Sequence, residues 1–244
     1  MMSMTGSAAR ARPYTWLCFD ADGVLFDYDR AETRALSEAL AAAGHRLDPE
    51  LQALYRRINR ELWSAWEQGR VRVEDLKTLR FERFLQQAGI PCRVEAFAER
   101  YLETLSRGCD LWCGCRETLP LLRERYHLAV LTNGLSRVQR PRLAGAGLLP
   151  WFDLLIISEE IGAAKPARAF FDAAWERMGR PAPERVLIIG DSWEADIAGA
   201  AACGWRTCWF NPAGAPPPTP EPVPRIVRSW EELRAWLVDG IRAA

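Results

Sequence analysis

Several features that mark particular classes of protein are missing from this chain of 244 residues. No apolar run approaches the length of about 20 residues that a membrane-spanning helix needs. The 32 basic residues are balanced by 32 acidic ones, whereas a protein that binds nucleic acid usually presents a basic surface. We therefore expect neither a membrane nor a nucleic acid polymer as a partner.

A secretory signal is also missing from the N-terminus. Residues 1–13 are small, polar and basic, and they lack the apolar central stretch that such a signal carries. We interpret these residues as a disordered leader on a cytoplasmic protein.

Histidine is scarce, and cysteine does not form a recognisable framework. The seven cysteines are odd in number and scattered in spacing, which argues against a set of disulfides. Cys109, Cys113 and Cys115 lie close together in the sequence, but two histidines in the whole chain leave few partners for a zinc site. We predict ordinary reduced cysteines, as is usual in the cytosol.

What is present indicates a globular α/β protein. Apolar residues make up 49% of the chain and charged residues 26%, which is typical of a soluble protein with a sizeable core. Short apolar runs alternate with helical patterns, which predicts a Rossmann-like, doubly wound parallel sheet. The expected strands are residues 15–19, 127–132, 154–157, 185–189, 206–210 and 225–227, and the helices between and after them are residues 117–125, 136–146, 167–178, 194–203 and 230–238.

One long stretch interrupts this alternation. Residues 30–107 contain no convincing strand, and four amphipathic patterns predict helices instead. These helices are expected over residues 31–43, 49–67, 73–88 and 94–106, with glycine or proline between them. We predict an all-helical cap over residues 30–107, inserted into a catalytic core of residues 14–29 and 108–244.

A pair of acids follows the first expected strand, in Asp20-Ala21-Asp22-Gly23. Two carboxylates at positions i and i+2 repel one another unless a cation lies between them. Magnesium prefers a few carboxylates together with phosphate oxygens. The alternative is an ordinary acidic turn at the surface, so this motif alone leaves the question open.

Three further polar clusters follow later strands of the expected sheet. Thr132 and Asn133 precede a helix, where a hydroxyl and backbone amides can hold an anion. Lys165 precedes a proline and could pair with phosphate, and Asp191 lies five residues before a second acid, Asp196. Each cluster has an ordinary explanation as a helix cap or a solvated loop. The four together, in this order and each at a strand end, indicate one site.

These motifs resemble those of the haloacid dehalogenase superfamily: Asp20 and Asp22, Thr132, Lys165, and Asp191 with Asp196. The resemblance covers nearly the whole chain, and the helical insertion matches the superfamily's cap of the first type (C1). It implies a magnesium-dependent phosphatase, with manganese as a possible substitute. It also implies a small phosphate ester as the partner, and it leaves open whether the protein is a monomer or a homodimer.

The resemblance also implies a role for each residue. Asp20 would be the nucleophile that carries phosphate, and Asp22 would act as general acid and then as general base. Thr132 and the Asn133 amide would hold phosphate oxygens, while Lys165 would neutralise both phosphate and Asp20. The metal ligands would be Asp20, Asp191 and the backbone carbonyl of Asp22, with Asp196 in or near the second shell of the ion.

A narrower resemblance concerns the substrate. The segments 19–26, 131–134, 152–166 and 208–211 are similar to bacterial pyrimidine 5′-nucleotidases of the house-cleaning type, although that family often has Glu where Gly23 stands. A nucleoside 5′-monophosphate is therefore the favoured substrate. The alternatives are a sugar or organic-acid phosphate, such as phosphoglycolate or an acylneuraminate phosphate, and a non-catalytic scaffold. Asp22 argues against dehalogenation, because the true dehalogenases lack an acid at that position.

The cap offers one candidate for recognition of a base. Trp63 and Trp66 are three residues apart on one expected helix and share a face. A base could stack on Trp63, or both rings could simply pack in the core of the cap. Arg57, Asn59 and Glu61 lie nearby as possible polar contacts, and nothing in the sequence selects among them.

Overall fold

The computed structural model describes residues 13–218 and 224–240, so nearly all of the expected leader lies outside the described residues. Six parallel strands form one sheet in the order β3-β2-β1-β4-β5-β6. Their bounds are β1 (Trp16–Phe19), β2 (His127–Thr132), β3 (Leu154–Ile157), β4 (Val186–Gly190), β5 (Arg206–Phe210) and β6 (Arg225–Val227). The predicted Rossmann-like parallel sheet is confirmed.

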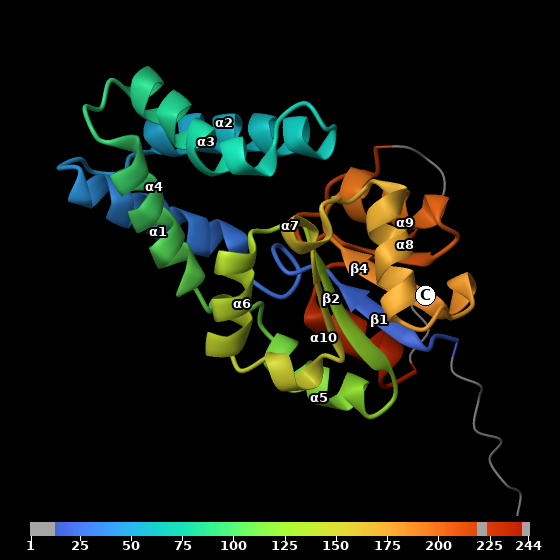
Figure 1. Ribbon diagram of the computed structural model, residues 1–244. Helices are drawn as coiled ribbons and strands as arrows, with labels where there is room; N and C mark the ends of the chain where they lie inside the picture. Colours follow the sequence, from blue (N-terminus) through green and yellow to red (C-terminus); the bar gives the residue numbers. More distant parts are fainter. Residues whose placement is uncertain (1–12, 219–223, 241–244) are drawn as a thin grey trace, which may run out of the picture.

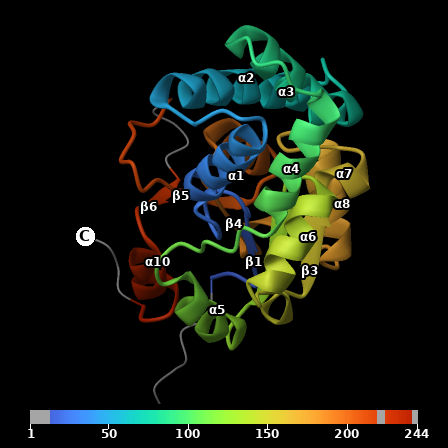
Figure 2. The same cartoon turned by 90° about the vertical axis from the view of Figure 1, so that its left-hand side faces the viewer.

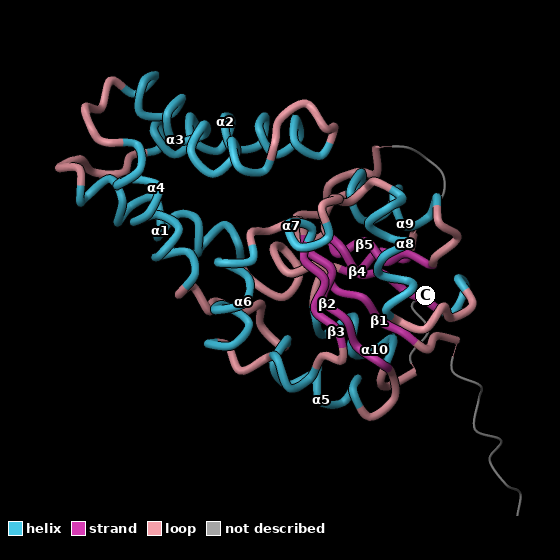
Figure 3. The backbone as a smooth tube through the Cα atoms, viewed as in Figure 1, coloured by secondary structure: helices cyan, strands magenta, loops and turns pink. Residues whose placement is uncertain are grey.

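The strands are short and apolar because helices cover both faces of the sheet (Figure 3). Side chains alternate along β1: Leu17 and Phe19 pack into one buried cluster, and Trp16 and Cys18 pack into another on the opposite face. A strand buried on both faces reads as a continuous apolar run rather than as an alternating one. This explains why the strands were visible in the sequence.

The helices of this α/β unit are α5 (Cys115–Arg123), α6 (Ser136–Gly145), α7 (Ser158–Ile161), α8 (Arg168–Arg177), α9 (Gly199–Ala202) and α10 (Trp230–Leu237). The prediction of one regular helix over residues 194–203 is wrong. A π-helix, η3 (Trp193–Ala198), precedes α9 there, and the Ile197 amide donates to the Ser192 carbonyl five residues earlier, at 3.3 Å. Such wide turns often occur at functional sites, and this one carries Asp196.

Four further helices form a layer apart from the sheet (Figure 1). They are α1 (Tyr28–Ala42), α2 (Pro49–Glu67), α3 (Val73–Ala88) and α4 (Val94–Ser106). Helix α1 begins earlier than the sequence pattern indicated, because the Asp27 side chain caps it by accepting a hydrogen bond from the Arg30 amide at 3.2 Å. The other three helices have the expected bounds.

The helical layer is packed around its own apolar core and is also attached to the α/β unit. Helix α4 lies against α6 (Figure 2), and Leu135 and Val138 at the start of α6 belong to the same buried cluster as the four helices. Residues from α2 and α3 thereby face the carboxyl ends of β1 and β2 across a shared cavity. No helix among the described residues is long and apolar enough to cross a bilayer.

Candidate active site

The carboxyl ends of β1, β2 and β4 meet where the strand order reverses, with β2 on one side of β1 and β4 on the other. Ligands of open α/β sheets bind in the crevice at such a point. Asp20 follows β1 directly, and its amide donates to the Ile189 carbonyl of β4 at 2.9 Å. The sheet therefore fixes the backbone of Asp20 at the middle of this edge.

Asp20 is largely buried, and its carboxylate is held by its neighbours. Its Oδ1 accepts a hydrogen bond from the Ala21 amide at 2.8 Å and lies 3.0 Å from Lys165 Nζ. Burial raises the pKa of Asp20 well above its usual range, against the opposing effect of Lys165. Little water surrounds the carboxylate. Its interactions with a cation or a phosphoryl group are therefore only weakly screened.

Lys165 is the cation at the centre of the site, with 1% of its surface exposed. Its Nζ lies 2.6 Å from Asp196 Oδ1, 3.0 Å from Asp20 Oδ1 and 2.9 Å from the Leu131 carbonyl oxygen. Burial alone would lower the pKa of Lys165, but the charges of Asp196 and Asp20 outweigh it and raise the pKa. The alternative of a solvated loop lysine is wrong.

Three carboxylates gather around this lysine. Asp20, Asp191 and Asp196 each present an oxygen within 4.8 Å of the other two. The pKa of Asp191 is raised to about 7, first because the surrounding protein displaces water from its carboxylate and then because of the charge of Asp196. Part of the Asp191 surface is nevertheless open to solvent. Two glycines make the close approach possible, since a Cβ at Gly23 would lie 2.2 Å from Asp191 Oδ2 and one at Gly190 would lie 2.2 Å from Asp196.

The donor set suits a hard divalent cation. Both oxygens of Asp196 already accept hydrogen bonds, from Lys165 Nζ and, at 3.2 Å, from the Ser192 amide. Asp196 is therefore occupied as a support for Lys165. Asp20 and Asp191 keep free lone pairs on neighbouring carboxylates, and magnesium prefers such oxygen ligands.

Asp22 lines the cavity beside Asp20, and two residues of α6 hold its side chain. Gln139 Nε2 donates to Asp22 Oδ2 at 2.6 Å, and Arg142 forms an ion pair with Asp22 Oδ1. Arg142 is fully buried, lies 4.1 Å over the Phe26 ring and donates through Nε to a backbone carbonyl. Gln139 and Arg142 were missed in the sequence, where their spacing on a polar helix was the only signal.

Thr132 and Asn133 reach the same cavity from the end of β2. The Thr132 hydroxyl accepts a hydrogen bond from the Gly134 amide at 3.0 Å. The side chain of Asn133 is committed to other partners. Its Oδ1 accepts from the Lys165 amide, and its Nδ2 donates to the Lys165 carbonyl and, at 3.0 Å, to Glu67 Oε1 of α2. Only the backbone amide of Asn133 is left for the anion-binding role that the sequence suggested.

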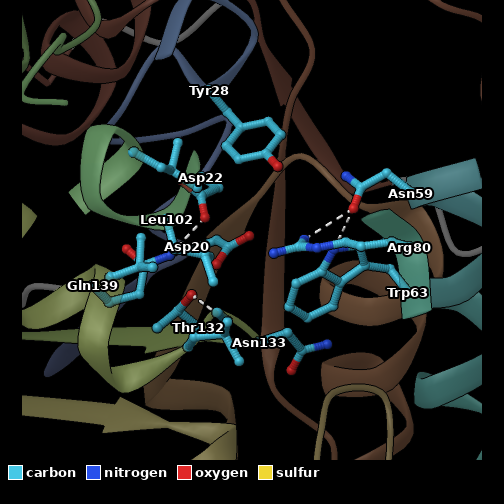
Figure 4. A pocket seen from close by; sticks show the side chains of 14 residues that line it. Asp20, Asp22, Tyr28, Asn59, Trp63, Arg80, Leu102, Thr132, Asn133 and Gln139 are labelled. Atoms are coloured by element: carbon cyan, nitrogen blue, oxygen red, sulfur yellow. Dashed lines mark hydrogen bonds between the residues drawn. The ribbon is translucent and has the colours of Figure 1, made fainter. Parts of the chain in front are cut away.

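The helical layer supplies the opposite wall of the cavity, formed by Tyr28, Asn59, Trp63, Arg80, Leu102 and Leu105 (Figure 4). Trp63 packs against the apolar core of the layer and also lines the cavity, so the two alternatives for this ring are not exclusive. Arg57 and Glu61 instead pair with each other on the exposed surface at 3.2 Å. Arg80 was missed, because a charged residue on an amphipathic helix normally indicates the solvent face.

The comparisons with known proteins agree with this geometry. A family model described as haloacid dehalogenase-like hydrolase matches residues 14–204. The HAD-hydrolase YfnB of Bacillus subtilis is 34% identical over 90% of this chain and 94% of its own. The pyrimidine 5′-nucleotidases YjjG of Escherichia coli and PynA of Streptococcus pneumoniae are 33% and 34% identical, over 81% and 82% of this chain and 86% and 84% of theirs.

A solved structure extends the likeness to three dimensions. The crystal structure of YfnB from Bacillus subtilis bound to magnesium has a TM-score of 0.86 to this chain at 32% identity, covering 93% of this chain and 99% of that one. This chain therefore belongs to the haloacid dehalogenase-like hydrolases, and pyrimidine 5′-nucleotidases are among its relatives.

Proposed function

We propose that this protein is a magnesium-dependent phosphatase that hydrolyses a pyrimidine nucleoside 5′-monophosphate through an aspartyl-phosphate. The observation that carries the proposal is the position of Asp20 at the edge of the sheet, where its carboxylate lies 3.0 Å from the Lys165 ammonium and within 4.8 Å of a carboxylate oxygen of Asp191. A buried carboxylate beside a fixed cation is suited to attack an anionic phosphoryl group, because the cation offsets the repulsion between them.

In the first step an oxygen of Asp20 attacks phosphorus, and the bond from phosphorus to the ester oxygen breaks. Asp22 gives a proton to the departing oxygen, so the alcohol leaves neutral. Lys165, Thr132 and the Asn133 amide hold the phosphoryl oxygens. Because the displacement is split into two steps, Asp20 and Asp22 can act in both of them.

In the second step Asp22, now ionised, takes a proton from a water molecule that attacks phosphorus. The bond from phosphorus to Asp20 breaks, and inorganic phosphate leaves. Gln139 and Arg142 hold the ionised carboxylate of Asp22 in place for this proton transfer. Positioning and charge supply most of the rate in such reactions.

Magnesium would be held by Asp20, Asp191 and the backbone carbonyl of Asp22, and when bound it supplies positive charge that offsets the phosphate oxygens. The free lone pairs of Asp20 and Asp191 support this assignment, as does the magnesium in the related YfnB structure. Manganese has the same preference for oxygen ligands and is expected to substitute.

We also propose that residues 30–107 act as a cap on a core of residues 14–29 and 108–244. Helices α2 and α3 contribute Asn59, Trp63 and Arg80 to a cavity whose other wall carries Asp20 and Asp22. A cap of this kind selects the substrate and keeps bulk water from the reacting atoms.

The substrate class rests on the relatives YjjG and PynA and on the aromatic wall of the cavity. A release assay for inorganic phosphate over about two dozen esters, with magnesium and with EDTA, tests it. We expect the highest kcat/KM with dUMP, UMP or dTMP and no turnover in EDTA. Preference for phosphoglycolate or a sugar phosphate would refute the proposed substrate class but not the proposed phosphatase mechanism. Absence of turnover on every ester would refute both.

A further inference from the structure

Arg80 of α3 is a buried cation at the wall of the cavity. Its side chain is 1% exposed, and its guanidinium carbon lies 4.7 Å from the centre of the Phe81 ring, 5.5 Å from that of Tyr101 and 5.8 Å from that of Trp63. No carboxylate among the described residues lies within ion-pair distance of Arg80. Its Nη1 donates to Asn59, its Nε is enclosed by protein without a partner, and no hydrogen bond among these residues uses its Nη2. A buried guanidinium with an unused donor is costly unless something else accepts from it.

Asn59 fixes the direction in which Arg80 points. The Asn59 Oδ1 accepts from Arg80 at 3.0 Å and from Trp63 Nε1 at 3.0 Å, while its Nδ2 donates to Glu32 at 3.4 Å. The guanidinium and the Trp63 ring are thus held together by one amide. Figure 4 shows the guanidinium entering the cavity between Tyr28 and Trp63, on the side that faces Asp20.

The surroundings favour a neutral acceptor over a second anion. The charge of Arg80 is already offset in part by Glu32, which lies behind Asn59, and by the faces of three aromatic rings. The Trp63 ring lies beside the guanidinium, and Tyr28 lines the same cavity, which suits a planar ring with an oxygen at its edge. Every pyrimidine base carries such an oxygen as the carbonyl at ring position 2.

We propose that Arg80 is a specificity-determining residue that donates a hydrogen bond to a carbonyl oxygen of the pyrimidine ring. This inference rests on the proposed function and adds the residue that distinguishes the base. Asn59 is a positioning residue, since it acts through Arg80 and Trp63. A site that must satisfy a buried donor discriminates strongly against a substrate that lacks the acceptor.

The test compares wild-type enzyme with Arg80→Met, Arg80→Lys and the control Arg83→Met. Arg83 lies on the exposed side of the same helix, so its replacement matches the loss of one arginine from α3. The substrates are dUMP, AMP, whose base has no carbonyl, deoxyribose 5-phosphate, which has no base, and phosphoglycolate. Melting curves monitored by circular dichroism establish which variants are folded.

We expect Arg80→Met to lower the ratio of kcat/KM for dUMP to that for deoxyribose 5-phosphate by about ten- to a hundredfold, mainly through KM. Arg80→Lys keeps the charge without the planar fork, so it should lose an intermediate factor; it also decides the matter if the methionine variant does not fold. Arg83→Met should leave the ratio as in wild type.

Three results would overturn the inference. If the wild-type enzyme prefers dUMP and the folded Arg80 variants keep the same ratio of kcat/KM values, the role of Arg80 is refuted and the proposed function is not. A selective loss of phosphoglycolate turnover would show that Arg80 binds a second anion. Wild-type enzyme that is inactive on every nucleoside 5′-monophosphate refutes the proposed substrate, and the inference with it.

Discussion

Replacement of Lys165 by methionine tests the electrostatics on which the site depends. Methionine keeps the length of the side chain and removes the ammonium, which holds three acceptors: Asp196, Asp20 and the Leu131 carbonyl. The Asp196 side chain is fully buried and would lose its cation. Removal of one partner from a buried ion pair costs about 3–5 kcal/mol, so we expect a loss of this size in the free energy of unfolding at pH 8.

The loss should depend on pH in a defined direction. The pKa of Lys165 is raised by folding. Its stabilising effect is therefore complete at any pH below the ordinary pKa of a lysine, and it is constant between pH 5 and 8. Asp20 and Asp191 have raised pKa values, and Lys165 lowers both. An acid whose pKa is higher in the folded than in the unfolded state destabilises the folded state increasingly as the pH rises from its unfolded pKa to its folded one.

Without Lys165 the pKa values of the neighbouring acids rise further. The deficit of Lys165→Met relative to wild type should therefore be smaller at pH 5.5, where the acids take up protons, than at pH 8. Urea unfolding followed by tryptophan fluorescence measures it at both values, since the chain has 11 tryptophans. EDTA is present throughout, so that no metal ion replaces the ammonium.

Two further variants serve as controls. Lys77 is the only other lysine of the chain, and its ion pair with Glu159 at 2.6 Å is partly exposed; its replacement by methionine should cost at most about 1 kcal/mol. The double variant Lys165→Met/Asp196→Asn should be more stable than Lys165→Met, because it removes the uncompensated charge. A deficit below about 1 kcal/mol, or one that is equal at both pH values, would refute the reasoning.

Three other substitutions address the chemistry. Asp20→Asn should lower phosphate release by at least about a thousandfold in a variant that still folds, because the amide cannot carry phosphate; substantial turnover would argue against a covalent step. Trp63→Ala should raise KM for dUMP more than KM for p-nitrophenyl phosphate, as equal changes would contradict a contact with the base. Gly23→Ala should raise the magnesium concentration needed for half-maximal activity severalfold, since its Cβ would displace the Asp191 carboxylate; an unchanged requirement would remove Asp191 from the metal site.

The parallel sheet could be predicted because its signal is local. Strands such as β4 are buried on both faces, so nearly every residue in them is apolar, and a run of this kind is visible without any knowledge of its neighbours. The clusters at Asp20, Thr132, Lys165 and Asp191 were visible for a related reason. A polar group that directly follows a buried strand is placed at the edge of the sheet by the strand itself.

The supports of the site could not be predicted, because they come from segments far apart in the sequence. Gln139 and Arg142 reach Asp22 over 117 and 120 residues, and in isolation they look like the polar face of a helix. The π-helix at Asp196 was also hidden, since its pattern of residues is compatible with an ordinary α-helix.

The sequence by itself therefore determined the class of fold and the edge of the sheet at which the chemistry takes place, because strand burial and strand ends leave a local pattern. Only the tertiary structure decided what surrounds that edge. It enclosed Arg80 against three aromatic rings and Asn59, and it committed Asp196 to Lys165. Burial of a charged side chain depends on helices that meet in space, and no spacing along one helix encodes it.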